Sequence, residues 1–409
     1  MDSAILGAFV FTYIGMALGR MPGLKIDRTG MALLAVVALL ALGRIEVGSM
    51  GAAIDLPTLL LLFALMIVSA QFAAAGFYRA VAARITSAAV SPAALLALTV
   101  GVSGLLSAVL ANDIIAFAMA PIIAEGIRRR GLDPRPFLIG LAGGCNAGSA
   151  ATIIGNPQNI LIGQTGGLDF WRFLLACAPP AVIGMAVAYG VVRWVWRDAL
   201  RAVPPGADAG PPPVPDRWQT AKGVAAVLVL AFLFTTDLPH EIGALVVAGF
   251  LLASRRLASR DMLGAVDWHL LVLFACLFIV TGAFAATGLA QDGVDWLTAA
   301  GWLPDRLMVL GPLMLAASNS IGNVPAVMLL LSVWTDPGEG ALYALAVLST
   351  LAGNLLIVGS LANIIIVERA ASVGVRLGFA DHARCGIPMT LLSMALAALW
   401  LWAAGWMAW

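Results

Sequence analysis

The sequence has little charge. Only 11% of its 409 residues are Asp, Glu, Lys or Arg, whereas soluble globular proteins carry about 25%. Hydrophobic residues make up 61% of the chain, and they gather in runs such as 59–76 and 270–288 that contain no charged side chain. These runs approach the roughly 20 residues that a helix needs to cross a bilayer, and they lack the polar face of a helix in a soluble protein. The composition therefore predicts a membrane protein built from helices.

Several chemical signals are also missing. The net charge is only +1 and no basic cluster with interleaved aromatic residues is present, so we expect no nucleic-acid partner. The four cysteines show no Cys-Xaa-Xaa-Cys spacing, which disfavours a zinc site or a disulfide framework. The chain has no His-Glu-Xaa-Xaa-His and no Gly-Xaa-Ser-Xaa-Gly motif, and we place His240, His269 and His382 in loops or at span ends. We therefore expect no enzyme activity, no cofactor and no metal site of this kind.

The two halves of the chain resemble each other in register. Residues 55–77 align with 267–289 at an offset of 212, and Gly-Asn-Pro-Gln-Asn-Ile at 155–160 aligns with Gly-Ser-Leu-Ala-Asn-Ile at 359–364 at an offset of 204. Chance similarity between apolar segments is the alternative, but the matched order of the segments and the aligned polar residues argue against it. The aligned polar pairs include Asp55 and Asp267, Ser107 and Ser318, Asn112 and Asn323, and Asn159 and Asn363.

We therefore expect an all-α polytopic membrane protein with two inverted repeats, each of five transmembrane helices plus one re-entrant hairpin. The repeats are 1–202 and 218–409, and a Pro-rich cytoplasmic linker at 203–217 joins them, since its prolines cannot continue a helix. The first apolar run has no positive charge before it, so we expect a span there and not a cleaved signal peptide. The expected spans are 3–19, 29–44, 57–78, 137–163, 171–196, 221–236, 241–254, 268–289, 341–367 and 386–408.

The two hairpins are expected at 92–127 and 305–334, where polar residues interrupt an apolar stretch midway. As one helix the first stretch would be about 54 Å long, far more than the roughly 30 Å of the hydrocarbon core. Arms of about 11–15 residues are too short to cross, so each hairpin should dip into the membrane and return.

Charge placement supports this threading. If the loop 20–28 lies in the cytoplasm, 20 of the 23 basic residues fall on the cytoplasmic side and only Arg44, Arg172 and Arg306 fall outside. Positive residues concentrate on the cytoplasmic side of inner-membrane proteins. We therefore expect a multi-pass protein of a bacterial-type inner membrane, with both termini outside.

Four polar interruptions carry the expected chemistry: the two hairpin turns and the segments 155–159 and 353–360. Interrupted helices in inverted repeats form substrate and ion sites near the midplane. Asn before each returning arm predicts a capped helix start, whose positive dipole end faces the site. A sodium site is expected near Asn112, Asn156 and Asn159. The candidate substrate- and ion-binding residues are Asn112, Asp113, Asn146, Thr152, Asn156, Gln158, Asn159, Ser318, Asn319, Asn323, Asn354, Ser360 and Asn363.

Asp113 is the only carboxylate that we place deep in the membrane, where insertion of an acid costs about 2.5–3.5 kcal/mol. It is a candidate proton carrier or cation ligand, and the alternative is a carboxylate that only caps the adjacent helix. We place no Lys or Arg at this depth, so an anionic substrate would be held by helix termini, amides and a bound cation.

At these residues the chain resembles the ion transporter superfamily, which includes arsenite efflux permeases, citrate and divalent anion symporters, and a sodium/proton antiporter branch. The segments Ala111-Asn112-Asp113 and 155–160 are similar to the arsenite-permease and citrate-transporter side. The resemblance implies an elevator-type mechanism. Ser318-Asn319-Ser320 nearly matches the Ser-Asn-Thr motif of the dicarboxylate branch, whereas hairpin one has Ser107-Ala108-Val109. This departure argues against sodium coupling at the first site and against a dicarboxylate substrate.

The expected function is secondary active transport of a small anion or metalloid, of arsenite/oxyanion or citrate/dicarboxylate type, coupled to protons or sodium. A sodium/proton antiporter is the alternative within the superfamily, and a channel is the alternative from another class. The expected partners are the substrate, the coupling ion and the lipid bilayer, and a homodimer is compatible with the sequence.

Overall fold

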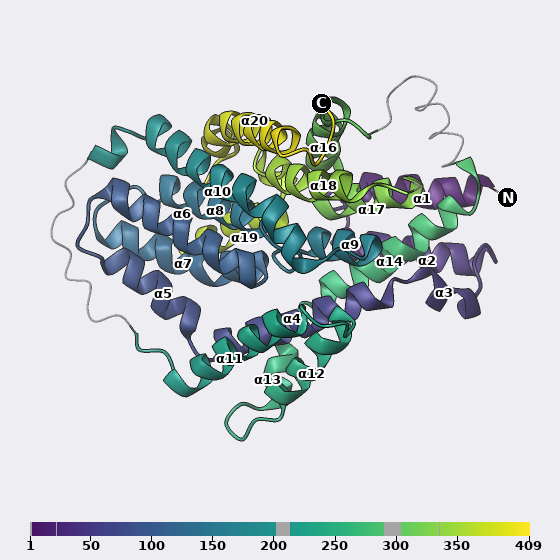
Figure 1. Ribbon diagram of the computed structural model, residues 1–409, viewed down its shortest axis with the longest axis horizontal. Coiled ribbons are helices and arrows are strands. Elements are labelled where there is room, and N and C mark those ends of the chain that lie inside the picture. Colours follow the sequence, from purple (N-terminus) through teal and green to yellow (C-terminus); the bar gives the residue numbers. More distant parts are fainter. Residues whose placement is uncertain (1, 22, 202–212, 290–303, 335) are drawn as a thin grey trace.

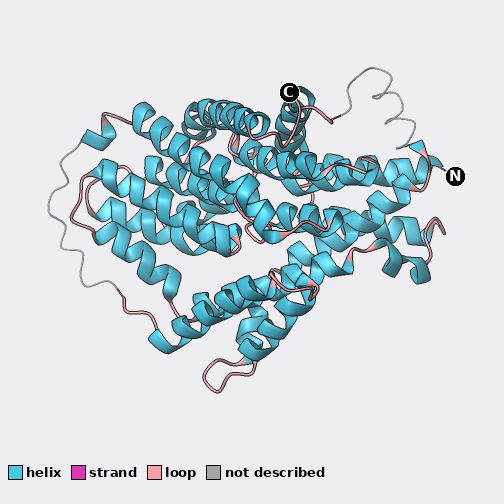
Figure 2. Ribbon diagram, in the orientation of Figure 1, coloured by secondary structure: helices cyan, strands magenta, loops and turns pink. Residues whose placement is uncertain are grey.

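The computed structural model describes residues 2–21, 23–201, 213–289, 304–334 and 336–409, which form helices joined by short loops (Figures 1 and 2). Within these ranges the only β pairing is an isolated bridge between Arg20 and Asp27. Large apolar side chains such as Leu105, 68% exposed, and Leu175, 69% exposed, point outward, as expected for a surface that faces lipid. The described helices that are long and apolar enough to cross a membrane are Leu56–Ala74, Pro92–Val109, Phe170–Val195, Trp268–Ala285 and Phe379–Ala403. The prediction of an all-α polytopic membrane protein is confirmed.

The described helices follow a similar order in the two halves of the chain. The helices of the first half are α1 (Asp2–Leu18), α2 (Arg28–Ala41), α3 (Val47–Ala53), α4 (Leu56–Ala74), α5 (Phe77–Ser87), α6 (Pro92–Val109), α7 (Asn112–Arg129), α8 (Arg135–Ser149), α9 (Pro157–Gly166) and α10 (Phe170–Val195). Those described in the second half are α11 (Arg217–Leu233), α12 (His240–Leu252), α13 (Ser259–Gly264), α14 (Trp268–Ala285), α16 (Leu307–Ile321), α17 (Asn323–Val333), α18 (Glu339–Ala352), α19 (Leu361–Ala371) and α20 (Phe379–Ala403). Short 3-10 helices lie at Ala199–Arg201 and Ile357–Gly359.

Aligned residues of the two halves begin and end corresponding helices. Asp55 accepts a hydrogen bond from the Thr58 amide at 3.1 Å and begins α4, and Asp267 accepts one from the Leu270 amide at 3.0 Å and begins α14. Both are N-caps, the position at which Asp satisfies an otherwise unpaired amide. Gly76 (φ +70°) and Gly288 (φ +82°) follow these helices in the left-handed conformation that glycine adopts without strain.

The helices form two groups. The hairpin group contains hairpin one (α6 and α7), hairpin two (α16 and α17), the broken helices α8–α9 and α18–α19, and α5, α10 and α20. The peripheral group contains α1 to α4 and α11 to α14, which lie along the lower edge and the right-hand end of Figure 1. We call the boundary between the two groups the seam.

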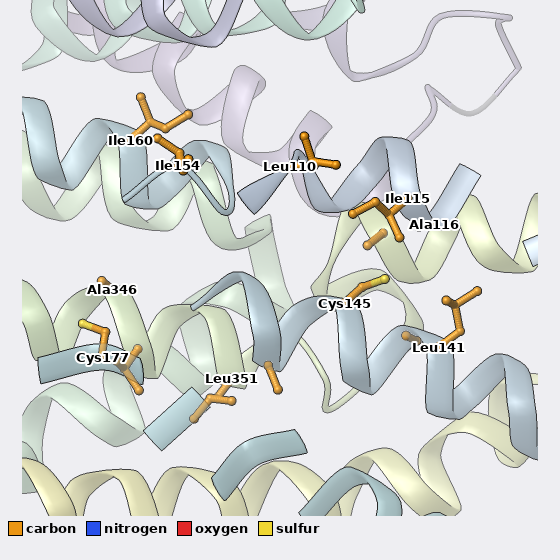
Figure 3. Close-up of a cluster of buried hydrophobic side chains, with 14 of the residues drawn as sticks. Leu110, Ile115, Ala116, Leu141, Cys145, Ile154, Ile160, Cys177, Ala346 and Leu351 are labelled. Carbon is orange, nitrogen blue, oxygen red and sulfur yellow. The ribbon is translucent and has the colours of Figure 1, made fainter. Parts of the chain in front are cut away.

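An apolar core holds the hairpin group together. Figure 3 shows Leu110 and Ile115 on either side of the hairpin-one turn, with Cys145 of α8 nearby, Ile154 within the break between α8 and α9, and Ile160 in α9. All five are at most 6% exposed. Close packing of this kind leaves the interrupted backbone little freedom to shift.

The spans and hairpins lie close to the predicted positions, but the arms of hairpin one differ. Each has 18 residues, α6 from Pro92 and α7 to Arg129, which is about 27 Å of helix. The expected 11–15 residues hold only for hairpin two, whose arms have 15 and 11. Short arms therefore do not account for the predicted return of hairpin one, and that prediction rests on its turn. The short helices α3, α5 and α13 were not predicted, and most of the predicted linker, 203–212, lies outside the described residues.

Candidate functional site

Both hairpins turn sharply and then start a helix. At hairpin one, Leu110 and Ala111 are extended and α7 begins at Asn112; at hairpin two, Gly322 has φ +94° and α17 begins at Asn323. The prediction that the two asparagines cap these helices is wrong, because the N-caps are Ala111 and Gly322 and neither makes a side-chain cap bond. Each helix begins one residue earlier than expected, so each asparagine side chain is available for other contacts.

The two broken helices have capped or sharply bent interruptions. The first runs from the end of α8 at Ser149 to Pro157, which is the first residue of α9 and not a kink within a continuous helix. Asn156 caps α9 by accepting from the Asn159 amide at 2.9 Å. The second break runs from Gly353 to Ser360 and contains one 3-10 turn. At the start of α19, where no side chain caps the helix, free amides can bind an anion or a polar group.

Hydrogen bonds connect the two breaks across the halves of the protein. Asn156 Nδ2 donates to Thr350 Oγ1 at 3.2 Å, and Ser360 Oγ donates to Asn146 Oδ1 at 2.9 Å. These two contacts are equivalent in the repeat, because 146 and 156 correspond to 350 and 360 at the offset of 204. Each half therefore contributes the same pair of positions to the joint between the breaks.

Further amides complete this network. Asn146 Nδ2 also donates to Asn354 Oδ1 at 2.8 Å and to Asn363 Oδ1 at 3.0 Å. Gln158 Nε2 donates to Thr350 Oγ1 at 3.2 Å. Buried polar groups are stable when they are paired in this way, so the network fixes the breaks in one geometry.

The hairpin turns contact the breaks in an equivalent manner. The backbone N–H of Asn112 donates to the Gly155 carbonyl at 3.4 Å. With its side-chain nitrogen assigned to face acceptors, Asn323 donates to the carbonyls of Gly359 at 2.8 Å and Ser349 at 3.3 Å. Gly155 and Gly359 correspond at the offset of 204, so each turn meets the same position of its own half's break.

A cavity of about 90 Å³, which we call the tip cavity, lies where these four interruptions meet the peripheral group. A cavity of roughly 10–15 Å³ already holds one water, so this one has room for a small solute. The Asn112 side chain lines this cavity, is 5% exposed, and its Oδ1 accepts no hydrogen bond from the described residues. The polar and charged residues of its lining are Arg28, Asn112, Asp113, Gln158, Asn323 and Ser360.

A second cavity, of about 390 Å³, lies on the same seam, and we call it the side cavity. Apolar residues form most of its wall, with five of them from α4 (Leu62, Leu65, Met66, Ala70 and Ala73), and Asn156 and the exposed Asp267 also line it. Asp113 lines both cavities. Its carboxylate makes no hydrogen bond or ion pair with any described residue, so its charge, or its proton, faces open space.

The structure separates the predicted site residues into three sets. Asn112, Asp113, Gln158, Asn323 and Ser360 line the tip cavity. Asn156 lines the side cavity with Asp113. The residues that line neither cavity and instead hold the turns and breaks, or are buried beside them, are Asn146, Thr152, Asn159, Ser318, Asn319, Asn354 and Asn363.

Two of the residues in the last set tie hairpins to breaks. Thr152 Oγ1 donates to the Ala108 carbonyl of hairpin one at 2.5 Å. Asn319 Nδ2 donates to the Ala352 carbonyl at the end of α18 at 2.9 Å. Their contacts are with protein backbone, which is the reason they do not reach a cavity.

Three contributors were missed or misplaced by the sequence. Arg28, expected in a cytoplasmic loop, lines the tip cavity. His382, expected at an interface, is 2% exposed and its Nε2 lies 3.0 Å from the Asn354 carbonyl of the second break. Thr350 was not named, although its alignment with Asn146 in the repeat was a signal that identifies it. Arg28 and His382 had no such signal, because each reaches the site through the packing of a distant helix.

The polar groups at the site are amides, hydroxyls, one carboxylate and the Arg28 guanidinium. Among the described residues, no group of three or more His, Cys, Asp or Glu side chains has metal-binding geometry. Amide and carboxylate oxygens of this kind suit hard cations, and the helix N-termini of α7 and α17 suit anions.

Comparison with known proteins agrees with this architecture. A family model described as citrate transporter matches residues 13–341. An uncharacterized transporter of Mycobacterium tuberculosis is 30% identical over 372 residues, which cover 86% of this chain and 87% of the relative. The silicon efflux transporter LSI3 of Oryza sativa subsp. japonica is 27% identical over 472 residues, which cover 97% of each chain.

The fold is also that of a solved transporter. The crystal structure of the Alcanivorax borkumensis YdaH transporter matches with a TM-score of 0.60 at 16% identity, over 98% of this chain and 97% of that one. The family and these relatives are transporters and not enzymes. Because the family match and the relatives at 30% identity extend over most of its length, this chain belongs to the citrate transporter family of the ion transporter superfamily, and it is a membrane transporter.

Proposed function

We propose that this protein is a secondary active transporter of a small anion or metalloid, driven by a proton or sodium gradient. One observation carries the proposal: residues from both hairpin turns and both helix breaks line a single cavity. Interrupted helices are costly in a membrane and persist where they line a cavity. If the tip cavity binds the transported solute, the two hairpin turns and the two helix breaks are expected to meet there.

The substrate class follows from the donors and from the relatives. Two helix N-termini and several amides suit a carboxylate, an oxyanion or a small polyhydroxy metalloid. The names of the family and of the rice relative refer to citrate and to silicon. A carboxylate and a metalloid are therefore the two candidate substrate classes. Both are small, oxygen-rich solutes.

We propose an elevator-type motion in which the hairpin group slides along the peripheral group. Both cavities lie on the seam, so sliding of the hairpin group would carry them from one side of the membrane to the other. Few polar contacts oppose this motion: within the described ranges the side-chain hydrogen bonds across the seam are long, at 3.4–3.5 Å. They are Gln164 to Glu241, Tyr78 to Ser69 and Tyr13 to Pro325.

For coupling, we propose that Asp113 carries the proton or ligates the cation. Its position between the two cavities gives it access to the substrate on one side and to a second path on the other. Sodium would also find amide oxygens, because Asn112 Oδ1 and Asn159 Oδ1 are buried without partners. The same position of Asp113 favours the alternative function, a sodium/proton antiporter, in which ions exchange at Asp113 and no other solute moves.

We further propose that the two repeats, 1–202 and 218–409, are inverted in a bacterial-type inner membrane, with both termini outside. The matching order of helices supports two repeats, and the charge distribution along the sequence supports the orientation.

Flux into proteoliposomes tests these proposals. Purified protein is reconstituted, and uptake of citrate, sulfate, arsenite and orthosilicic acid is measured with a proton gradient, a sodium gradient or neither, beside protein-free liposomes. Accumulation of one solute above its external concentration, only with a gradient, is the expected result. Exchange of sodium for protons without movement of any solute would identify the antiporter, and downhill flux that ignores both gradients would identify a channel.

A further inference from the structure

Arg28 is placed at the tip cavity by a contact with the preceding helix. It is the first residue of α2, and its Nε donates to the Met16 carbonyl in the last turn of α1 at 3.0 Å. Met16 itself lines the tip cavity beside Arg28. The contact satisfies one of the carbonyls that a helix C-terminus leaves unpaired and holds the guanidinium at the cavity wall.

The rest of the guanidinium is unused. An arginine has five N–H donors, and in the described part of the chain only the Nε of Arg28 meets an acceptor. Arg28 forms no ion pair with a described carboxylate, including Asp113. Arg130 provides a contrast, since its terminal nitrogens donate to the carbonyls of Thr86, Ala88 and Val90.

The other groups that line the tip cavity do not neutralise the positive charge of Arg28. The N-termini of α7 and α17 add partial positive charge, and Asp113, once it holds a proton or a cation, adds no net negative charge. The unpartnered Asn112 Oδ1, 5% exposed, is an acceptor suited to a hydroxyl group. The free N–H donors of the Arg28 guanidinium form a fork that can bind two oxygens of a carboxylate or an oxyanion.

We propose that Arg28 binds the negatively charged group of the transported solute in the tip cavity, and that the solute is a carboxylate or an oxyanion and not a neutral hydroxide. This inference rests on the proposed function and narrows it, because orthosilicic acid and arsenous acid are uncharged at neutral pH. Arg28 belongs to the peripheral group, so it contacts the solute from the wall opposite the hairpin turns. The interaction would therefore form when the tip cavity faces α2 and be released when the hairpin group slides away.

A purely structural role for Arg28, as a donor to the Met16 carbonyl, is the competing explanation. Two substitutions separate the roles: Arg28→Gln keeps an N–H donor but removes the charge, and Arg28→Lys keeps the charge but loses the fork. Lys25→Gln is the matched control, because Lys25 is exposed in the loop just before α2 and lines neither cavity. Thermal unfolding in detergent is measured for all three variants to detect structural damage.

The test is uptake of labelled citrate, sulfate and arsenite, together with stabilisation of the detergent-solubilised protein by citrate and by sulfate. We expect Arg28→Gln to lower the apparent affinity for the transported anion by about tenfold or more, the size of a lost charged hydrogen bond. Arg28→Lys should retain part of the affinity for the anion, and Lys25→Gln should have the same affinity as wild type. The unfolding temperature without anion should stay the same in all variants.

Three results would overturn the inference. The first is equal anion affinity in Arg28→Gln and wild type. The second is transport of arsenite alone, with no anion transported or stabilising, which would leave the broader transport function intact. The third is no flux and no stabilisation by any of these probes, which would count against the proposed function as well.

Discussion

Asn159 and Asn363 make the same two hydrogen bonds in the two halves of the protein. Asn159 Nδ2 donates to the carbonyls of Ser149 at 3.2 Å and Thr152 at 2.9 Å, which lie ten and seven residues earlier. Asn363 Nδ2 donates to carbonyls at the same separations, those of Gly353 at 2.8 Å and Leu356 at 3.2 Å. A helix break frees carbonyls that need donors, and one amide at each break supplies them. The repeat visible in the sequence is therefore also a repeat of how each break is held open.

Replacement of either asparagine should destabilise the protein. Asn159→Ala and Asn363→Ala each remove two buried hydrogen bonds and leave carbonyls unpaired, at a cost of about 1–3 kcal/mol. Because the contacts are equivalent, the two variants should lose similar stability, as measured by thermal unfolding in detergent. Ser372→Ala, whose exposed hydroxyl bonds only to its own helix end, is the control. A loss in only one of the two variants would show that the second break does not depend on this amide.

The hairpin turns should respond differently from the breaks. The Asn112 side chain makes no hydrogen bond to a described residue, so Asn112→Ala should barely change stability and yet reduce uptake. Asn323 donates to the carbonyls of Gly359 in the second break and Ser349 in α18, so Asn323→Ala should reduce uptake and also lower stability by about 1–3 kcal/mol. Ser320→Ala is the control, since its exposed hydroxyl donates within α16. Normal uptake in Asn112→Ala would mean that this side chain does not contact the solute.

Local signals account for what the sequence predicted. Apolar runs, capping aspartates and polar interruptions are properties of a few adjacent residues, and they located the spans, the hairpins and the breaks. The helix starts at Asn112 and Asn323 were placed one residue late, because the backbone conformation of Ala111 and Gly322 decides where each helix begins. Arg28 was placed away from the site because only the packing of α1 and α2 against the hairpin group brings it to the cavity.

Surface labelling tests the inverted orientation. The residues Arg129, at the end of hairpin one, and Gly338, after hairpin two, are exposed and occupy corresponding places in the two repeats. Single cysteines introduced there should react with an impermeant thiol reagent from opposite sides, Gly338→Cys from outside and Arg129→Cys from the cytoplasm. All four native cysteines are buried, so the unmodified protein serves as the unreactive control. Labelling of both positions from the same side would contradict inverted repeats.

Asp113 should be essential for coupling but not for binding. Its counterpart in the other repeat is Val324, so the hairpin fold does not require a carboxylate at this place. Its side chain does not cap α7, since the N-cap is Ala111 and no side-chain cap bond is present. Asp113→Asn keeps the shape of the side chain but cannot ionise. We expect the variant to lose uphill accumulation driven by a gradient, while downhill exchange of the solute continues at least in part.

The matched control is Asp267→Asn, because Asp267 is a second carboxylate that lines the side cavity. Asp267 caps α14 through its hydrogen bond from the Leu270 amide, and Asn caps a helix about as well as Asp, so this variant should accumulate solute as wild type does. Accumulation ratios with and without the gradient are compared for the three proteins. Normal uphill accumulation in Asp113→Asn would show that Asp113 does not carry the coupling ion. The unpartnered amide oxygens of Asn112 and Asn159 would then be the groups left to bind it, and the coupling ion would be a cation such as sodium, because a neutral amide does not carry a proton near neutral pH.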